Sequence, residues 1–216
     1  NYLEEDLSNW DTGNVTLMTE LFISAYYMNP NISGWNTRNV NNMSKMFSFA
    51  SSFNQPLEWN TSNVETMSGM FFRAENFDQP LNWDTSNVTD MSEMFLGASS
   101  FNQPLNWDTS NVRDMGGMFT DATYFNNNIS NWDTSNVDTM ANMFMFARSF
   151  NKPLEWNTRN LKDMESMFSN AKSFNQPLQW DTHNVTNMSA MFQEATSFNQ
   201  PLLWNTQSVT NMSEMF

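Results

Sequence analysis

The sequence predicts an α/β solenoid, a rod of about eight to nine repeated units that each contain a short parallel strand and a short helix. Three observations predict this fold. Tryptophan recurs every 24 or 25 residues, apolar residues alternate just before each tryptophan, and apolar residues with helical spacing follow it. Such short units bury apolar side chains only against their neighbours, so residues 1–216 are expected to form a single elongated domain. The units begin at Trp10, Trp35, Trp59, Trp83, Trp107, Trp132, Trp156, Trp180 and Trp204.

The predicted helix lies in the second half of each unit. In the unit that begins at Trp83, the apolar residues at i, i+3, i+4, i+7 and i+10 are Met91, Met94, Phe95, Ala98 and Phe101. This spacing places all of them on one face of a helix. Asp90 precedes the segment and Glu93 follows three residues later, as in a capping box that starts a helix.

The predicted strand lies just before each tryptophan. Pro104 disfavours helix in the residue before it, and Leu105 and Trp107 then alternate with a polar residue, which is typical of a short strand with Leu and Trp on its inner face. Such strands are expected to pair in parallel with those of adjacent units. The two longer units carry their extra residue in the same place, at 28–33 and 125–130, which indicates a loop at the side of the solenoid.

The repeat motif reads Trp-Asp-Thr-Ser-Asn-Val-Thr-Asp-Met-Ser-x-Met-Phe at residues 83–95. It resembles the repeats of BspA-type leucine-rich-repeat surface proteins of bacteria, and the resemblance covers essentially the whole chain. It implies a right-handed solenoid of leucine-rich-repeat type, located outside the cell or at its surface. Members of that family are thought to adhere to hosts or other surfaces. The resemblance implies no catalytic residues in this chain, because the family repeat has no catalytic motif.

The composition excludes several classes of partner. The chain has 23 acidic and 9 basic residues, a formal charge of −14, whereas a nucleic-acid backbone requires a basic stripe and an anionic membrane attracts basic segments. The sequence has no apolar run of 18 residues, so direct membrane insertion of this segment is not expected. It contains no cysteine, so disulfide chemistry is excluded. The chain begins and ends inside a unit, which predicts that it is part of a longer polypeptide that supplies any anchor or export signal.

The acidic column after tryptophan is the one candidate metal site. Asp84, Asp108 and Asp133 would stack about 5 Å apart in successive units and could offer carboxylate oxygens to Ca²⁺. The favoured interpretation is that each aspartate accepts hydrogen bonds within its own turn, because asparagine replaces it freely in other units. No cofactor is expected. His183 is the sole histidine, stands in a variable column, and has no accompanying nucleophile, so the chain is not expected to be an enzyme.

Threonine two residues after each tryptophan could form an ice-binding ladder, and the tryptophans themselves could form a platform for sugars. The residue next to each threonine varies, and each tryptophan keeps its place near an apolar residue, usually Leu two positions earlier. Both patterns favour buried packing. The asparagine four residues after each tryptophan, replaced once by Ser208, is expected to form a ladder of side-chain amides along the stack.

Variable columns are the better place to seek a binding surface. Large apolar residues stand at predicted outward positions thirteen and fourteen after tryptophan, and these partner-binding candidates are Ile23, Phe49, Phe72, Leu96, Met145 and Phe146. The expected function is a non-enzymatic scaffold outside the cell that mediates adhesion or binds a protein or glycan. The alternative is a structural module that packs against neighbouring subunits in a larger complex or filament.

Overall fold

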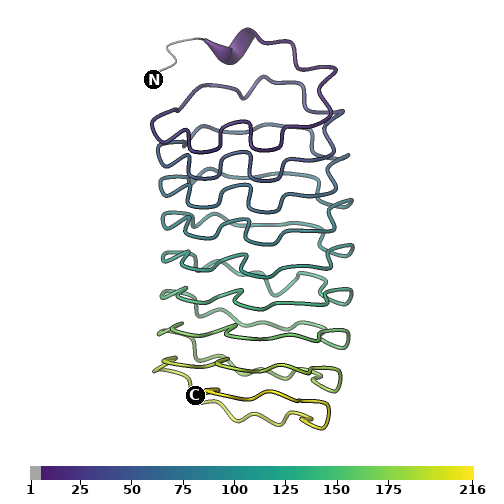
Figure 1. The fold of residues 1–216 in the computed structure, drawn as a ribbon, viewed down its shortest axis with the longest axis vertical. Coiled ribbons are helices and arrows are strands. Elements are labelled where there is room, and N and C mark those ends of the chain that lie inside the picture. Colours follow the sequence, from purple (N-terminus) through teal and green to yellow (C-terminus); the bar gives the residue numbers. More distant parts are fainter. Residues whose placement is uncertain (1–5) are drawn as a thin grey trace.

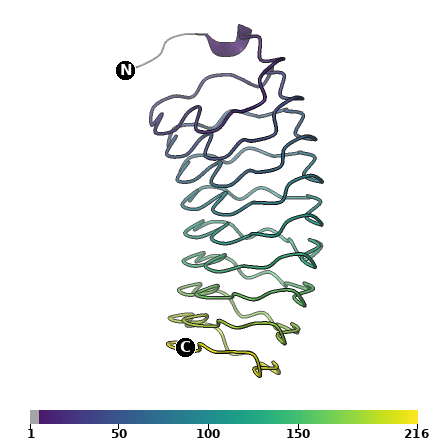
Figure 2. The same ribbon diagram turned by 45° about the vertical axis from the view of Figure 1, so that its right-hand side comes forward.

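The chain winds into a stack of similar coils, one coil for each repeat (Figures 1 and 2). This computed structural model describes residues 6–216. The described part of the chain runs from one end of the stack to the other. Isolated parallel bridges join residues seven positions after tryptophan in successive coils, from Leu17 and Asn42 through to Asn187 and Asn211. Successive coils are therefore stacked in register, with equivalent residues lying next to each other.

The prediction of a strand and a helix in every unit is wrong, and the chain is not an α/β solenoid of leucine-rich-repeat type. Within residues 6–216 the only helix is η1, a 3₁₀ helix at Leu7–Asn9. In the same range the coils are joined by single-residue bridges, without extended strands or a sheet. The segment before each tryptophan is therefore not a strand, and the apolar segment after it is not a helix.

The apolar segment after each tryptophan is a series of tight turns. The amide of Met94 donates to the carbonyl of Met91, three residues earlier, at 3.3 Å. The amide of Glu93 donates instead to the carbonyl of Gly116 in the next coil, at 2.8 Å. The alternation continues along the segment, with amides bonding in turn within their own coil and to the next one. An α-helix requires each amide to reach the carbonyl four residues earlier, so this pattern excludes the predicted helix.

Left-handed backbone at two fixed positions produces these turns. Among the described residues, every residue with positive φ stands ten or fourteen positions after a tryptophan. Glu93 has φ of 56° and Gly97 has φ of 70°. Most of these positions hold residues other than glycine, although the left-handed conformation costs such residues about 1–2 kcal/mol each. The bonds between coils offset this cost, since each turn directs an amide toward the neighbouring coil.

Gly97→Ala is expected to destabilise the chain by about 1–2 kcal/mol, because alanine is strained at positive φ. The added Cβ would also lie 2.9 Å from Cγ of Arg73 in the preceding coil. Urea unfolding of the two proteins measures the difference. The matched control is Gly34→Ala, whose Cβ would meet nothing within 4 Å. Equal destabilisation by both changes would show that the backbone at Gly97 does not require glycine.

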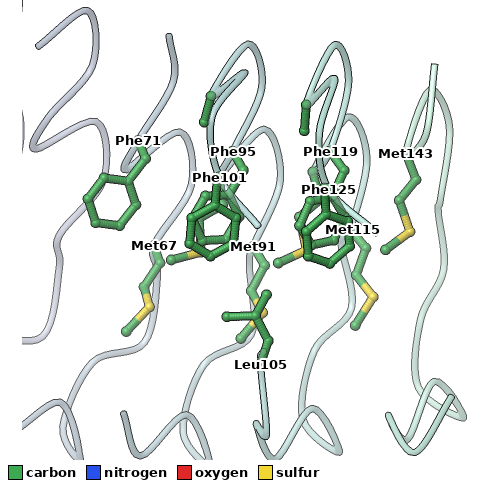
Figure 3. Close-up of a cluster of buried hydrophobic side chains, with 14 of the residues drawn as sticks. Met67, Phe71, Met91, Phe95, Phe101, Leu105, Met115, Phe119, Phe125 and Met143 are labelled. Atoms are coloured by element: carbon green, nitrogen blue, oxygen red, sulfur yellow. The ribbon is translucent and has the colours of Figure 1, made fainter. Parts of the chain in front are cut away.

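The core runs the whole length of the stack and uses the inward residues that the sequence identifies. Met91 and Phe95 are fully buried, and their equivalents occupy the same places in successive coils (Figure 3). The tryptophans form a second column, in which the rings of Trp83 and Trp107 lie 6.4 Å apart and nearly parallel. The inward set is correct although the helix is not, because turns that repeat every four residues bring nearly the same positions inward as a helix does.

The longer units accommodate their extra residue in a local turn at the predicted position. The side chains of Asn31 and Asn128 accept hydrogen bonds from the amides two residues later, at 3.2 and 3.0 Å. Trp132 then donates its amide to the carbonyl of Ile129, and both side chains remain buried. The insertion therefore changes the outline of the coil without shifting the core columns.

Candidate functional site

The acidic column after tryptophan stabilises the turns of the coils. Asp84 accepts from the amide and the hydroxyl of Ser86 at 3.1 and 2.7 Å, and Asp108 and Asp133 accept the equivalent amides at 3.0 and 2.9 Å. This agrees with the interpretation that each carboxylate serves its own turn. Within residues 6–216, no three His, Cys, Asp or Glu side chains form a group that could hold a metal ion.

The turn bonds give the aspartates of this column a defined effect on acid stability. Hydrogen bonds from the Ser86 hydroxyl and amide lower the pKa of Asp84 below its ordinary value of 3.8, those from Ser110 lower the pKa of Asp108, and those from His183 lower the pKa of Asp181. A carboxyl whose pKa is lower in the folded chain contributes stability above its unfolded pKa. That contribution is lost as the pH falls through the folded pKa.

The triple change Asp84→Asn, Asp108→Asn and Asp181→Asn is therefore expected to make stability less dependent on pH between about 5 and 2. Asparagine already holds this place at Asn36 and accepts the same turn bond, so the fold is retained. Urea midpoints at a series of pH values measure the effect. An unchanged pH profile would contradict the assigned role of these carboxylates.

The other constant polar columns join one coil to the next. The Thr85 hydroxyl donates to the carbonyl of Asp108 at 2.8 Å, and the threonines of this column from Thr12 to Thr182 are buried, whereas Thr206 is exposed. The indole of Trp83 donates to the carbonyl of Leu57 at 3.0 Å. Asn87 donates to Ser62 at 2.7 Å, as part of the expected amide ladder, although its side chain is exposed. The buried-packing interpretation is confirmed for the threonines from Thr12 to Thr182 and the tryptophans from Trp35 to Trp180.

A second ladder of side chains was not found from the sequence. A large apolar residue stands eighteen positions after each tryptophan, and the residue that follows it is Asn or Asp. The side chain of this Asn or Asp accepts a hydrogen bond from the amide of the equivalent residue in the next coil. Asn102 donates its amide to Asp78 at 2.9 Å, and Asn126 donates to Asn102 at 2.9 Å. The recurrence of Phe-Asn-Gln in the sequence was the available signal.

The partner-binding candidates lie in two adjacent columns, thirteen and fourteen positions after tryptophan, on the side of the stack formed by the tight turns, which we call the turn face. We call this set the apolar row, and its members are Ile23, Phe49, Phe72, Leu96, Met145 and Phe146. Backbone bonds hold the two columns of the row in register, for example from the amide of Phe49 to the carbonyl of Phe72 at 2.7 Å. Ile23 is 43% exposed and the other members are half-buried. The row is therefore partly accessible along its length.

Four members of the apolar row form two pairs. The rings of Phe49 and Phe72 lie 5.2 Å apart, and the guanidinium of Arg73 lies 6.0 Å from the centre of the Phe49 ring. Leu96 and Met145 line one surface hollow from opposite sides, together with residues of the coil between them. Whether these side chains bind a partner remains a prediction.

Two members of the row adopt strained backbone. Phe49 and Phe146 each have φ of 59°, a conformation that is unusual for bulky residues. Elsewhere in this column the residues are polar or glycine, such as Ser24, Gly97 and Asn170. The left-handed turn at this position recurs in the other coils, but a bulky aromatic residue adds cost there, and residues that cost stability concentrate at functional sites. The sequence alone gives no sign of it.

The hollow between Leu96 and Met145 was also not identified from the sequence. Its floor is the pair Gly116–Gly117, in a row where neighbouring coils carry at least one larger side chain. Asp114 lines the same hollow, and burial raises the pKa of its carboxyl above 3.8, with a further contribution from nearby carboxylates. The glycine doublet, unique among the repeats, was the available signal.

The only histidine has a simple environment. Nδ1 of His183 lies 2.8 Å from the carboxylate of Asp181, two residues earlier, and both side chains are about half exposed. This pair stabilises its turn. Across the described part of the chain, no helix is long and apolar enough to cross a membrane.

Comparison with known proteins relates the repeats to one family. A family model described as "Mycoplasma protein of unknown function, DUF285" matches residues 1–82, 81–179 and 154–216. The three overlapping matches cover the whole chain, as expected for tandem copies of one unit. No curated protein and no solved structure matches the chain.

Proposed function

Since the chain belongs to the DUF285 family of Mycoplasma repeat proteins, we propose that it is a non-enzymatic scaffold at the cell surface that binds a protein or glycan partner. The resemblance of its repeats to those of BspA-type surface proteins supports this location and an adhesive role. The net charge of −14 favours partners other than nucleic acids or anionic membranes.

One observation carries the proposal. The constant polar groups of the repeat are engaged in bonds within and between coils, whereas the apolar row remains partly accessible and includes phenylalanines held in strained backbone. A residue that costs stability and gains no full burial is best explained by a contact outside the coil. The partner surface is therefore assigned to the apolar row.

The positive φ of Phe49 and Phe146 allows a test in which the variant loses apolar side chains without losing stability. In the double variant Phe49→Asn and Phe146→Asn, asparagine tolerates positive φ better than phenylalanine, as Asn170 does in the same column. We expect this variant to be at least as stable as the parent chain. Labelled parent and variant proteins are compared for binding to cultured epithelial cells, and the variant is expected to bind about tenfold more weakly, as for the loss of central apolar contacts.

The matched control is Ser24→Asn, which introduces the same residue at positive φ in the same column without removing an apolar side chain. It should bind like the parent. Trypsin or glycosidase treatment of the cells identifies the partner as protein or glycan. Unchanged cell binding by the double variant would refute the role of the apolar row.

Light scattering over a range of concentrations tests the alternative, a module that assembles with copies of itself. Self-association that Phe72→Ser abolishes would favour assembly through the row. A monomer that binds cells would exclude assembly as the role of this surface.

A further inference from the structure

The hollow on the turn face exists because the coil that begins at Trp107 has two glycines where the neighbouring coils have larger residues. Gly116 and Gly117 form its floor, and Leu96 of the preceding coil and Met145 of the following coil form its walls. A Cβ on Gly117 would lie 3.4 Å from Cγ of Glu93 and 3.8 Å from Leu96, so these side chains lie beside the open space. The hollow interrupts the apolar row between Leu96 and Met145.

Backbone conformation explains only one of the two glycines. Gly117 has φ of 64°, where glycine is favoured. Gly116 is not among the residues with positive φ, and the equivalent places in the neighbouring coils are held by Ser92 and Ala141. A side chain at Gly116 would approach the carboxylate of Asp114, whose Oδ1 lies 3.1 Å from the position of its Cβ. The missing side chain keeps that carboxylate open to the hollow.

The hollow carries negative charge without a cation beside it. Glu93 and Asp114 both line it. In the described range the close contacts between a basic side chain and a carboxylate are Lys162–Asp138 and His183–Asp181, so neither carboxylate of the hollow has a basic partner. The amide of Gly116 donates to Oδ1 of Asp114 at 2.8 Å, which leaves Oδ2 to accept from an incoming group.

We propose that this hollow receives an arginine side chain of a partner protein. The carboxylates of Asp114 and Glu93 suit the planar guanidinium, which forms charge-assisted bonds with carboxylates. The apolar walls of Leu96 and Met145 suit the methylene stem, which packs on apolar surface while its charged end reaches the acids. An acidic chain also attracts a basic partner over distance. The inference rests on the proposed function, because two walls of the hollow belong to the apolar row.

The probe is the peptide acetyl-Gly-Gly-Arg-Gly-Gly-amide, titrated into the whole chain at low salt. Amide signals of Gly116 and Gly117 in NMR spectra report binding at the hollow. The same peptide with citrulline has nearly the same shape without the charge, and is expected to bind about tenfold more weakly. Equal affinities for the two peptides, or no shift of these signals at millimolar peptide, would overturn the proposal.

Two variants test the residues. Asp114→Asn removes the charge, and Gly116→Ser fills the hollow with the residue that Ser92 provides in the preceding coil. Each is expected to weaken binding of the arginine peptide about tenfold. The control Asp163→Asn removes a charge from the same column two coils away, where the carboxylate accepts the equivalent turn bond at 3.0 Å, and should change affinity less than about twofold. Equal losses from Asp114→Asn and Asp163→Asn would indicate general charge attraction and contradict a specific site.

Cell binding separates this inference from the proposed function. If Gly116→Ser loses the peptide but binds cells like the parent, the scaffold function stands and the hollow is not its contact. If cell binding does not depend on the apolar row but the peptide binds as expected, the arginine site is supported and the proposed scaffold function is refuted.

Discussion

Trp107→Ala is expected to destabilise the chain by about 3–5 kcal/mol, the cost of truncating a large buried aromatic residue. The indole is 4% exposed, stacks on tryptophans of both neighbouring coils at 6.4 and 6.3 Å, and donates to the carbonyl of Leu81 at 3.1 Å. Its loss leaves a cavity in the tryptophan column and an unpaired carbonyl. Urea unfolding followed by the near-ultraviolet circular dichroism of the remaining tryptophans measures the effect.

Trp10→Ala is the control for this prediction. Trp10 belongs to the same column, with its ring 6.2 Å from that of Trp35, but it is 52% exposed. Its truncation is expected to cost about 1 kcal/mol, since much less apolar surface is buried there. Because the stability of stacked repeats depends on contacts between neighbours, Trp107→Ala should also separate unfolding into two stages on either side of the changed coil. Similar costs for both changes would show that the column does not stabilise the stack as inferred.

Thr109→Val is expected to cost about 1–3 kcal/mol, although valine has nearly the same shape. The hydroxyl of Thr109 is buried and donates to the carbonyl of Asp133 in the next coil at 2.9 Å, and valine leaves that carbonyl without this donor. Thr109→Ser keeps the donor and should restore most of the stability. Thr196→Val makes the same change at an exposed position and should alter stability by less than about 0.5 kcal/mol. Equal effects of Val and Ser at position 109 would disprove the bond as the cause.

The sequence predicts the composition of the core better than the path of the backbone. Met91, Phe95 and Phe101 are buried as expected, because a strict repeat reveals which columns face inward. The helix is wrong because spacings of three and four residues fit both a helix and consecutive turns. Glycine would have revealed the left-handed positions, but residues such as Glu93 and Phe49 occupy most of them. The backbone hydrogen bonds between successive coils favour turns over a helix, and these bonds join residues 23 to 26 positions apart in the sequence.

The candidate site is only partly predictable for the same reason. Variable columns identify the apolar row, since a residue free to vary does not close the coil. The strain at Phe49 and the open carboxylate of Asp114 are properties of the folded backbone, which no column pattern records. The Gly116–Gly117 doublet was visible, but a pair of glycines in a sequence does not distinguish a tight turn from a missing side chain.

The amides that bond across the turn face belong to continuous chains of peptide groups. The peptide group between Ser92 and Glu93 accepts from Gly69 in the preceding coil and donates to Gly116 in the following one, each at 2.8 Å. Each link points the same way, so the peptide dipoles add along the axis of the stack, as they do in an α-helix. Hydrogen bonds in such a chain polarise one another, which couples coils that do not touch. The turn face is therefore an electrically polar surface, with N–H groups directed toward the C-terminal end and carbonyl groups toward the N-terminal end.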